Sequence, residues 1–290
     1  MEISFEARAR LQLLGAALLF STGGAALKAC SLGPWPLAGM RSLIAAVALL
    51  SFLPEARRGW TWRAVITGLA YAATLITFVL ANKWGPAANA IFLQATAPLY
   101  LLLLGPLLLH EKLARKDFFV LAWIATGLVL MLSGEGSGGW AWTAGDLMGL
   151  LSGVAWACLL TGLRWLARSG DRGTAEASVT LGNLITFAVC LPVAGNEALG
   201  AFELKNALIL LYLGIFQIAL AYVLVVRSVR FLPALEAAAL LLIEPVLNPV
   251  WAWLLQGERP APNILAGGAA ILAGTLGGSV RPAKSRPAAQ

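Results

Sequence analysis

The chain has 290 residues, of which 59% are hydrophobic and 12% are charged, and its mean hydropathy is +0.80. A soluble domain is about half apolar and about a quarter charged, so this composition excludes a single water-soluble core. The net charge of +7 does not indicate nucleic-acid binding, because the basic residues lie in short gaps between apolar runs, as in membrane proteins. Cys30, Cys158 and Cys190 lie inside apolar runs and match neither a disulfide framework nor a metal spacing.

Ten apolar runs follow one another along the chain. Roughly 20 apolar residues cross a bilayer as a helix, and the first run is too long for the apolar region of a cleaved signal peptide. The pattern therefore predicts an all-α membrane protein with about ten transmembrane helices. The predicted spans are 10–29, 36–53, 63–82, 87–109, 117–133, 145–166, 175–194, 206–226, 234–256 and 262–280.

The distribution of lysine and arginine predicts the orientation. With the N-terminus in the cytoplasm, 16 of the 21 basic residues fall on the cytoplasmic side, as the positive-inside rule requires. The other five, which fall in the outer half, are Lys28, Arg41, Lys83, Lys205 and Arg259. We therefore expect a multi-pass protein of the cell inner membrane with both termini in the cytoplasm.

An internal repeat appears when the sequence is shifted by 147 residues. Pro86 then falls on Pro233, and Pro98 falls on Pro245. The same shift places Glu111 on Glu258 and Gly127 on Gly274, and 12 of the 42 positions from 86 to 127 are identical. Leucine and alanine matches are common in such a composition, but two prolines, a glutamate and a glycine at one offset indicate a duplication.

Each copy of the repeat holds five predicted spans, so the second copy must enter the membrane upside down. We expect a first five-helix repeat over residues 1–139 and a second, inverted one over 140–290, with a short disordered basic tail from Arg281. Inverted repeats are a recurrent design of secondary transporters, in which the substrate site lies near the midplane between the halves. The duplication therefore predicts transport by alternating access.

Two segments resemble the EamA-type, ten-span branch of the drug/metabolite transporter superfamily. One runs from Leu232 to Val246 and closes with Leu255-Gln-Gly-Glu-Arg259, and the other runs from Leu93-Gln-Ala-Thr-Ala-Pro98 to Lys112. The stretch Leu19-Phe-Ser-Thr22 is similar to the Leu-Trp-Ser-Thr of an aromatic amino acid exporter of that family, with Phe20 in place of Trp. The resemblance implies an exporter of amino acids, aromatic ones included, or of similar metabolites. An exporter of drugs or of nucleotide-sugar-like compounds is the alternative.

Glu244 is an acidic residue at the middle of a predicted span. An ionisable group there is expensive and usually faces the bundle interior or water. Pro245 follows it, and Asn248 and Trp251 share its helix face. Glu244 either lies near a substrate amine or a proton on a cavity wall, or is a protonated, architectural residue bonded to a neighbouring helix.

Other polar and aromatic side chains align at helical spacing within the spans. Prolines inside spans free backbone carbonyls and kink helices, so they are candidate hinges. We expect the hinges to be Pro98, Pro245 and Pro249, and the substrate-binding residues to be Tyr71, Phe78, Tyr100, Trp156, Gln217, Tyr222, Glu244 and Asn248.

Lys28 and Arg41 lie in the outer thirds of the first two predicted spans. Their long side chains either extend to the outer interface or attract a substrate carboxylate from a central cavity. Both interpretations remain open from the sequence.

Other classes of function have little support. A lipid-modifying enzyme would need a cluster of Asp, His or Lys near an interface, and a channel would need a charged ring or a filter sequence. The sequence pattern shows neither. His110 has no nucleophile or carboxylate partner in the sequence pattern, so we expect no catalytic residue, no metal site and no cofactor. The expected partners are a small-molecule substrate and the lipid bilayer, without nucleic acid, and we expect the chain to act as a monomer or homodimer.

Overall fold

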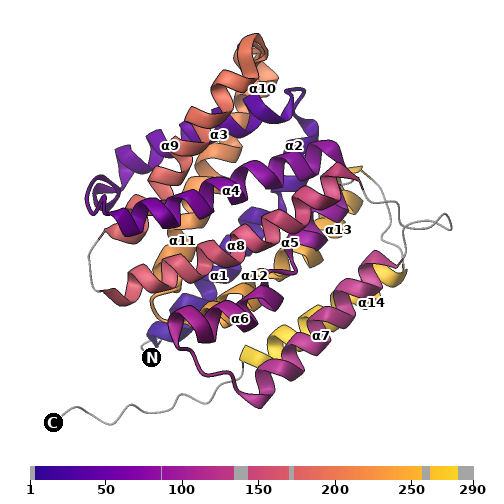
Figure 1. Cartoon of the computed structure of the whole chain (residues 1–290). Helices are drawn as coiled ribbons and strands as arrows, with labels where there is room; N and C mark the ends of the chain where they lie inside the picture. Colours follow the sequence, from indigo (N-terminus) through magenta and orange to yellow (C-terminus); the bar gives the residue numbers. More distant parts are fainter. Residues whose placement is uncertain (1–3, 86, 134–142, 170–172, 257–261, 280–290) are drawn as a thin grey trace.

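The computed structural model describes residues 4–85, 87–133, 143–169, 173–256 and 262–279, and this part of the chain contains helices and no strand (Figure 1). The helices, in chain order, are α1 (Phe5–Ser21), α2 (Gly23–Ala29), α3 (Pro34–Phe52), η1 (Pro54–Arg57), α4 (Trp62–Trp84), α5 (Ala87–Gln94), α6 (Ala97–Leu109), α7 (Arg115–Leu132), α8 (Ala144–Ser169), α9 (Thr174–Ala194), η2 (Gly195–Phe202), α10 (Leu204–Tyr212), η3 (Leu213–Leu220), α11 (Ala221–Ser228), α12 (Ala234–Leu241), α13 (Ile243–Gln256) and α14 (Pro262–Ser279).

Each predicted span coincides with one helix or with consecutive helices. The spans predicted at 87–109 and 234–256 are the pairs α5–α6 and α12–α13. Seven of the helical segments in the described residues are long and apolar enough to cross a membrane, and α7 and α14 contain shorter apolar stretches. The all-helical membrane fold is therefore confirmed, whereas the count of ten spans is only partly confirmed.

The repeat is visible in the helix boundaries. An offset of 147 carries both ends of α5 onto those of α12, and both ends of α7 onto those of α14. The interruption at Ala95–Thr96 falls at the same offset as the interruption at Leu242. The division predicted between residues 139 and 140 lies outside the described residues and stays a prediction.

The helices pack as a bundle around α4 and α8, which lie against each other. α4 also packs against α9, α9 against α3, and α1 against α11. The fifth helices of the two halves, α7 and α14, pair along their length at one side of the molecule (Figure 1). The contact between the halves therefore includes the last helix of each.

Two glycines that the repeat places at equivalent positions bring α7 and α14 together. A methyl group on Gly127 would lie 2.6 Å from the carbonyl oxygen of Gly267, and one on Gly274 would lie 2.9 Å from the Cβ of Trp123. Small residues let helix backbones approach closely in membranes. The matching glycines of the sequence are thus contact points between the two halves.

The buried carboxylate of Asp146 is used in the architecture. Its Oδ2 accepts hydrogen bonds from the backbone N–H and the hydroxyl of Thr143, both at 2.8 Å, and the Thr143 hydroxyl oxygen accepts one from the Asp146 N–H. This reciprocal pair caps the start of α8. The Asn89 amide donates to Oδ1 at 3.0 Å, so Asp146 also ties α5 to α8.

An ion-pair network joins the two halves at the end of the bundle where α6 ends. Glu111 accepts hydrogen bonds from Arg164 at 3.1 Å and from Arg168 at 2.7 Å. Arg164 also donates to the carbonyl oxygens of Val229 and Arg230. At the same end Arg10 on α1 pairs with Glu236 on α12 at 2.9 Å. These bonds fix first-half residues to second-half residues.

Candidate functional site

Four helices are interrupted inside the bundle. The first has a turn at Thr22, between α1 and α2, and those at α5–α6 and α12–α13 are broken at Ala95–Thr96 and Leu242. The segment η3, between α10 and α11, is π-helical. Irregular backbone at membrane depth is tolerated where it is buried in protein or lines a cavity, and π-helical turns are frequent at functional sites. The interruptions therefore point to a site between the helices.

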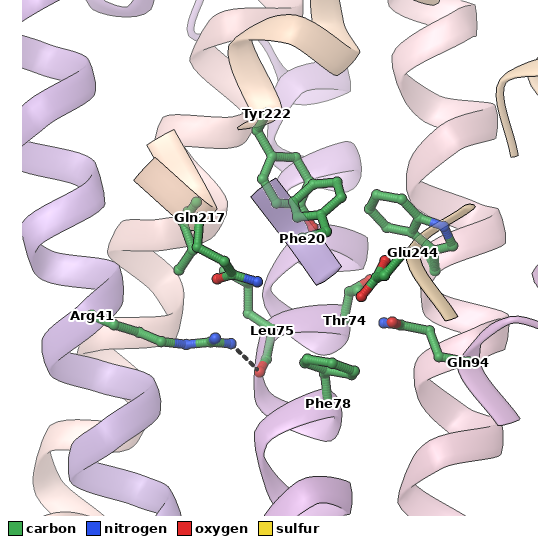
Figure 2. Close-up of a pocket in the computed structure, with 11 residues that line it drawn as sticks. Phe20, Arg41, Thr74, Leu75, Phe78, Gln94, Gln217, Tyr222 and Glu244 are labelled. Carbon is green, nitrogen blue, oxygen red and sulfur yellow. Dashed lines mark hydrogen bonds between the residues drawn. The ribbon is translucent and has the colours of Figure 1, made fainter. Parts of the chain in front are cut away.

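A central cavity lies beside these four interruptions (Figure 2). Each interrupted helix contributes a lining residue next to its interruption: Phe20, Gln94, Gln217 and Glu244. The other lining residues, which come from α3, α4, α8, η3 and α11, are Arg41, Thr74, Leu75, Phe78, Trp156, Ile218 and Tyr222.

The cavity is narrow in this conformation. The space open to the centre of a water molecule is about 30 Å³, which is room for about two waters when each needs ~10–15 Å³. An amino acid does not fit in this space without movement of the surrounding helices. The structure is therefore a closed conformation of the site.

Aromatic rings form one wall of the cavity. The ring of Phe20 meets those of Trp156 and Tyr222 edge-on, with centroids 6.0 and 5.1 Å apart, and Trp156 meets Tyr222 at 5.7 Å. Tyr71 packs behind Tyr222 at 4.3 Å and is fully buried. Edge-to-face packing at these distances holds the rings in fixed orientations, so the wall is a rigid apolar surface.

Polar side chains form the facing parts of the cavity. The Gln94 amide donates a hydrogen bond to the Ser152 hydroxyl at 2.8 Å, while the Gln217 amide oxygen has no partner. Figure 2 shows the Arg41 guanidinium and the Glu244 carboxylate pointing toward the cavity from opposite sides. Within the described residues neither of them takes part in an ion pair. The cavity thus presents one guanidinium and one carboxyl group separated by a gap.

Glu244 and Trp156 also line an adjoining hollow, between the two broken helices. Pro98 and Pro245 line this hollow, together with Gln94. Pro98 is in the first turn of α6, and Pro245 is in the first turn of α13. The two proline positions that the repeat relates therefore lie next to the central cavity.

Five of the eight predicted substrate residues lie around the central cavity. They are Phe78, Trp156, Gln217, Tyr222 and Glu244. The other three, Tyr71, Tyr100 and Asn248, do not line it: Tyr71 lies behind Tyr222, Tyr100 packs against the hydrophobic core, and Asn248 lies against Gly24. Pro249 lies within α13. Substrate binding and hinge motion at all of these positions stay predictions.

The structure adds cavity residues that are not among the eight predicted substrate-binding residues. Arg41 is 1% exposed and points inward, so it does not extend to the outer interface. Lys28, by contrast, is exposed and donates to the Gly85 carbonyl at 3.2 Å. Phe20, Thr74 and Gln94 also line the cavity. The sequence signal that could have identified Phe20 and Gln94 is that both lie in segments that resemble the EamA-type family.

Two larger hollows lie away from the four interruptions. One is beside the Glu111 network and is lined by charged side chains of the α6–α7 connection, α7, α8 and α12. The other lies between α4, α6 and α8, and its lining includes the exposed side chains of Ile66 and Leu108, which suits a lipid-facing groove. Neither combines an inward-pointing arginine and glutamate with buried aromatic rings, so the smaller central cavity is the better candidate site.

The described residues hold no group of three or more His, Cys, Asp or Glu side chains placed to bind a metal ion. The charged groups that line the central cavity, Arg41 and Glu244, are one cation and one carboxylate. This part of the chain therefore offers no arrangement typical of a metal centre.

The model of the EamA-like transporter family matches the chain twice, over residues 8–133 and 143–279. The two matches place one copy of the family domain in each half. They agree with the duplication that the offset of 147 residues indicates.

Curated relatives are also transporters. The pseudopaline exporter CntI of Pseudomonas aeruginosa is 26% identical over 208 residues, which are 72% of this chain and 71% of the exporter. An uncharacterized transporter of Clostridium kluyveri is 32% identical over 93 residues, and the match spans 32% of this chain and 30% of that protein. The similarity of residues 19–22 to an aromatic amino acid exporter is not tested by these relatives and stays a prediction.

A crystal structure of another protein superimposes with a TM-score of 0.72 at 20% identity, covering 93% of this chain and 96% of that one. This likeness shows the fold alone. The double match of the family model covers most of the chain, and the fold has the duplicated helices that the match implies. The chain therefore belongs to the EamA-like transporter family of the drug/metabolite transporter superfamily.

Proposed function

We propose that the protein is a secondary transporter that exports amino acids, aromatic ones included, or similar small metabolites across the cell inner membrane. One observation carries this proposal: four interrupted helices, drawn from both repeats, meet at one buried cavity that is lined by an arginine, a glutamate and aromatic rings. Discontinuous helices at the repeat interface are the usual construction of a transporter's substrate site.

The proposed mechanism is alternating access. With both termini in the cytoplasm, the Glu111 network lies at the cytoplasmic end and closes it in the present conformation. Opening of this end requires Arg164 and Arg168 to release Glu111, while one of the two helix pairs, α5–α6 or α12–α13, bends at its break. Because the halves are inverted copies, a bend in the other pair would open the opposite side.

The lining of the cavity supports an amphipathic substrate. The wall of Phe20, Trp156 and Tyr222 offers an apolar, ring-lined surface for a side chain. Glu244 offers a carboxylate to a substrate amine or a place for a proton. The exporter CntI among the relatives supports export as the direction of transport.

The alternative substrates fit the cavity less well. A nucleotide sugar or another phosphorylated compound carries two or more negative charges, whereas Arg41 is the one cation among the described lining residues. A phosphate that paired with Arg41 would also lie in the same cavity as the Glu244 carboxylate, and the repulsion between two negative groups is unfavourable. Amino acids are therefore the preferred class.

The proposal is tested with the purified full-length protein in proteoliposomes. Uptake of labelled amino acids is measured with and without a pH gradient, and protein-free liposomes are the control. Saturable uptake of one or more amino acids is expected. Absence of saturable flux for every amino acid tested, in a preparation that is folded by its thermal unfolding curve, would overturn the amino-acid assignment.

A further inference from the structure

Arg41 is a buried cation that lacks a full set of partners. It lies on α3 and is 1% exposed. One terminal nitrogen, Nη2, donates to the Leu75 carbonyl oxygen at 3.2 Å, and the nitrogens Nε and Nη1 have no acceptor. A guanidinium carries five donors in a planar fork, and its burial is costly unless the charge is paired. Most of this fork is therefore left for a group that the protein itself does not supply.

The direction of Arg41 shows where this group would sit. Figure 2 places the guanidinium at the edge of the central cavity, with Gln217 on one side and Leu75 and Phe78 on the other. A side chain of α3 that served only to reach the membrane interface would point outward along the helix. Arg41 instead extends its guanidinium toward the cavity.

The opposite side of the cavity carries Glu244, which points back toward the centre (Figure 2). A compound with only a carboxylate or only an amine would bond one of the two residues and leave the other without a ligand partner. A compound with both groups can bond Arg41 and Glu244 together. A site whose buried polar group would be left without a partner rejects the wrong ligand more strongly than a site that discriminates by size alone.

We infer that Arg41 binds the carboxylate of the substrate, and that the cavity takes small zwitterions bearing a carboxylate and an amine beside an apolar or aromatic side chain. The inference rests on the proposed transport function, because it names the substrate class of that cavity. Arg41 forms the bidentate bond that guanidinium groups make with carboxylates. Glu244 faces the amine, and the rings of Phe20, Trp156 and Tyr222 contact the side chain.

The test compares three ligands of the same shape on the purified full-length protein in nanodiscs. L-Phenylalanine has both charged groups, L-phenylalaninamide lacks the carboxylate, and 3-phenylpropanoate lacks the amine. Binding is followed by tryptophan fluorescence, because Trp156 lines the cavity. We expect phenylalanine to bind at least about tenfold more tightly than either analogue, as the loss of one charge-assisted pair predicts.

Variants then assign the carboxylate preference to Arg41. Arg41→Gln is expected to weaken phenylalanine binding at least about tenfold and to leave the affinity for the amide unchanged, so that the preference disappears. Arg41→Lys keeps the charge without the planar fork, so its affinity for phenylalanine is expected to lie between that of the wild type and that of Arg41→Gln. Arg227→Gln is the matched control, since Arg227 is exposed on α11, and it should retain the full preference.

The outcomes separate this inference from the transport proposal. Equal affinity for phenylalanine and its amide in the wild type, or a retained preference in Arg41→Gln, would overturn the role of Arg41 even if amino acids are transported. Carboxylate-dependent binding without any flux would support the role of Arg41 and overturn the transport proposal. No binding of any of the three ligands would overturn the inference. If Arg41→Gln does not fold, Arg41→Lys tests the residue: a full carboxylate preference in that variant would overturn the role of the Arg41 fork.

Discussion

Glu111, at the end of the first repeat's fourth helix, accepts a hydrogen bond at 3.1 Å from Arg164 of the second repeat. Both side chains are only 13% exposed. Arg164 in turn donates to the carbonyl oxygens of Val229 and Arg230, at 2.7 and 2.8 Å. A single carboxylate thus links the two halves at one end of the molecule, where a transporter that alternates between two conformations must open and close.

Replacing Glu111 by Gln should open this end more often. The substitution leaves an amide oxygen as an acceptor but removes the negative charge that pairs with Arg164 and Arg168, and loss of the partner charge in a largely buried ion pair costs up to about 3–5 kcal/mol. We expect the thermal unfolding midpoint to fall by several degrees, and a cysteine placed at Gln94 in a cysteine-free protein to react several-fold faster with a maleimide added from the cytoplasmic side.

The control for this prediction is Glu55→Gln, which alters an exposed glutamate on η1. It should change neither the unfolding midpoint nor the labelling rate. If Glu111→Gln leaves labelling at the wild-type rate, the network does not restrict access from the cytoplasm.

Substitution of Gly127 by Ala should destabilise the contact between α7 and α14. The added methyl group would lie 2.6 Å from the Gly267 carbonyl oxygen, and backbone of a packed helix has little freedom to move away. Overpacking of this kind costs about 1–3 kcal/mol. The unfolding midpoint of the purified protein in detergent should therefore decrease.

Gly105 provides the matched comparison on α6. A methyl group there meets nothing within 4 Å, and alanine favours a helix over glycine by ~1 kcal/mol. Gly105→Ala should leave the unfolding midpoint unchanged or raise it slightly. A decrease in Gly105→Ala as large as that in Gly127→Ala would show that close approach of α7 and α14 is not the cause.

Much of the architecture was accessible from the sequence, because apolar length and proline position are local properties. The boundaries of the spans at 87–109 and 234–256 coincide with those of α5–α6 and α12–α13. The offset that aligned Pro98 with Pro245 also aligned the two helix breaks. A proline in an apolar run has a direct backbone consequence, so its effect did not depend on the rest of the fold.

Side-chain direction was less accessible, because it depends on helix phase and on neighbours. The spacing of Asn89, Thr96 and Tyr100 in the sequence would place them on one face of a continuous helix, yet α5 ends at Gln94 and α6 begins at Ala97. The break changes the phase: Asn89 bonds Asp146, and Tyr100 packs against the core. Arg41 shows the same limit, since α3 is apolar on most sides and its sequence sets the depth of Arg41 but not its direction.

Trp156 should contribute to binding through contact with an apolar or aromatic part of the substrate. Its ring lies against Phe20 and Tyr222 and lines both the central cavity and the hollow beside it. Trp156→Phe keeps a ring at the wall and should raise the KM of an aromatic amino acid only about two- to fivefold, whereas Trp156→Ala removes the ring and should raise it at least about tenfold.

The comparison variant is Trp123→Ala, which removes a partly exposed tryptophan of α7. It should leave the KM of the same amino acid unchanged in proteoliposomes. Because loss of a buried ring also destabilises a protein by about 3–5 kcal/mol, each rate is normalised to the fraction of folded protein. An unchanged KM in Trp156→Ala would remove the ring from the binding site.

Glu244 should be needed for coupling or for amine binding. Glu244→Gln keeps the size of the side chain but removes the charge and the exchangeable proton. We expect uptake of a labelled amino acid to fall at least about tenfold. Glu6→Gln, at an exposed position in the first turn of α1, should behave as the wild type.

The response to a pH gradient distinguishes the two roles of Glu244. If Glu244 only pairs the amine, Glu244→Gln should raise KM while a pH gradient continues to drive the residual flux. If Glu244 carries the proton, the gradient should have no effect on that flux. Flux that is indifferent to the substitution would assign Glu244 to the architecture of α13 alone.

Pro98 and Pro245 should affect the rate of the conformational change more than binding. A proline lacks the N–H that would bond to the carbonyl one turn earlier, which is that of Gln94 for Pro98 and that of Leu241 for Pro245. Alanine at either position supplies this donor and favours a continuous helix across the break. We expect Pro98→Ala and Pro245→Ala each to lower the maximal transport rate about two- to tenfold with little change in KM, because movement of gating elements often limits turnover.

The inverted repeat makes the two substitutions distinguishable. The equivalent breaks lie in halves of opposite orientation, so stiffening one should favour access from the cytoplasm and stiffening the other should favour access from outside. Maleimide labelling of a cysteine at Gln94, applied from each side in turn, would measure these opposite shifts. Pro54→Ala, at an exposed position in η1, should shift neither. If both cavity variants moved accessibility toward the same side, the bends at the two breaks would not be the alternating motions of a symmetric pair.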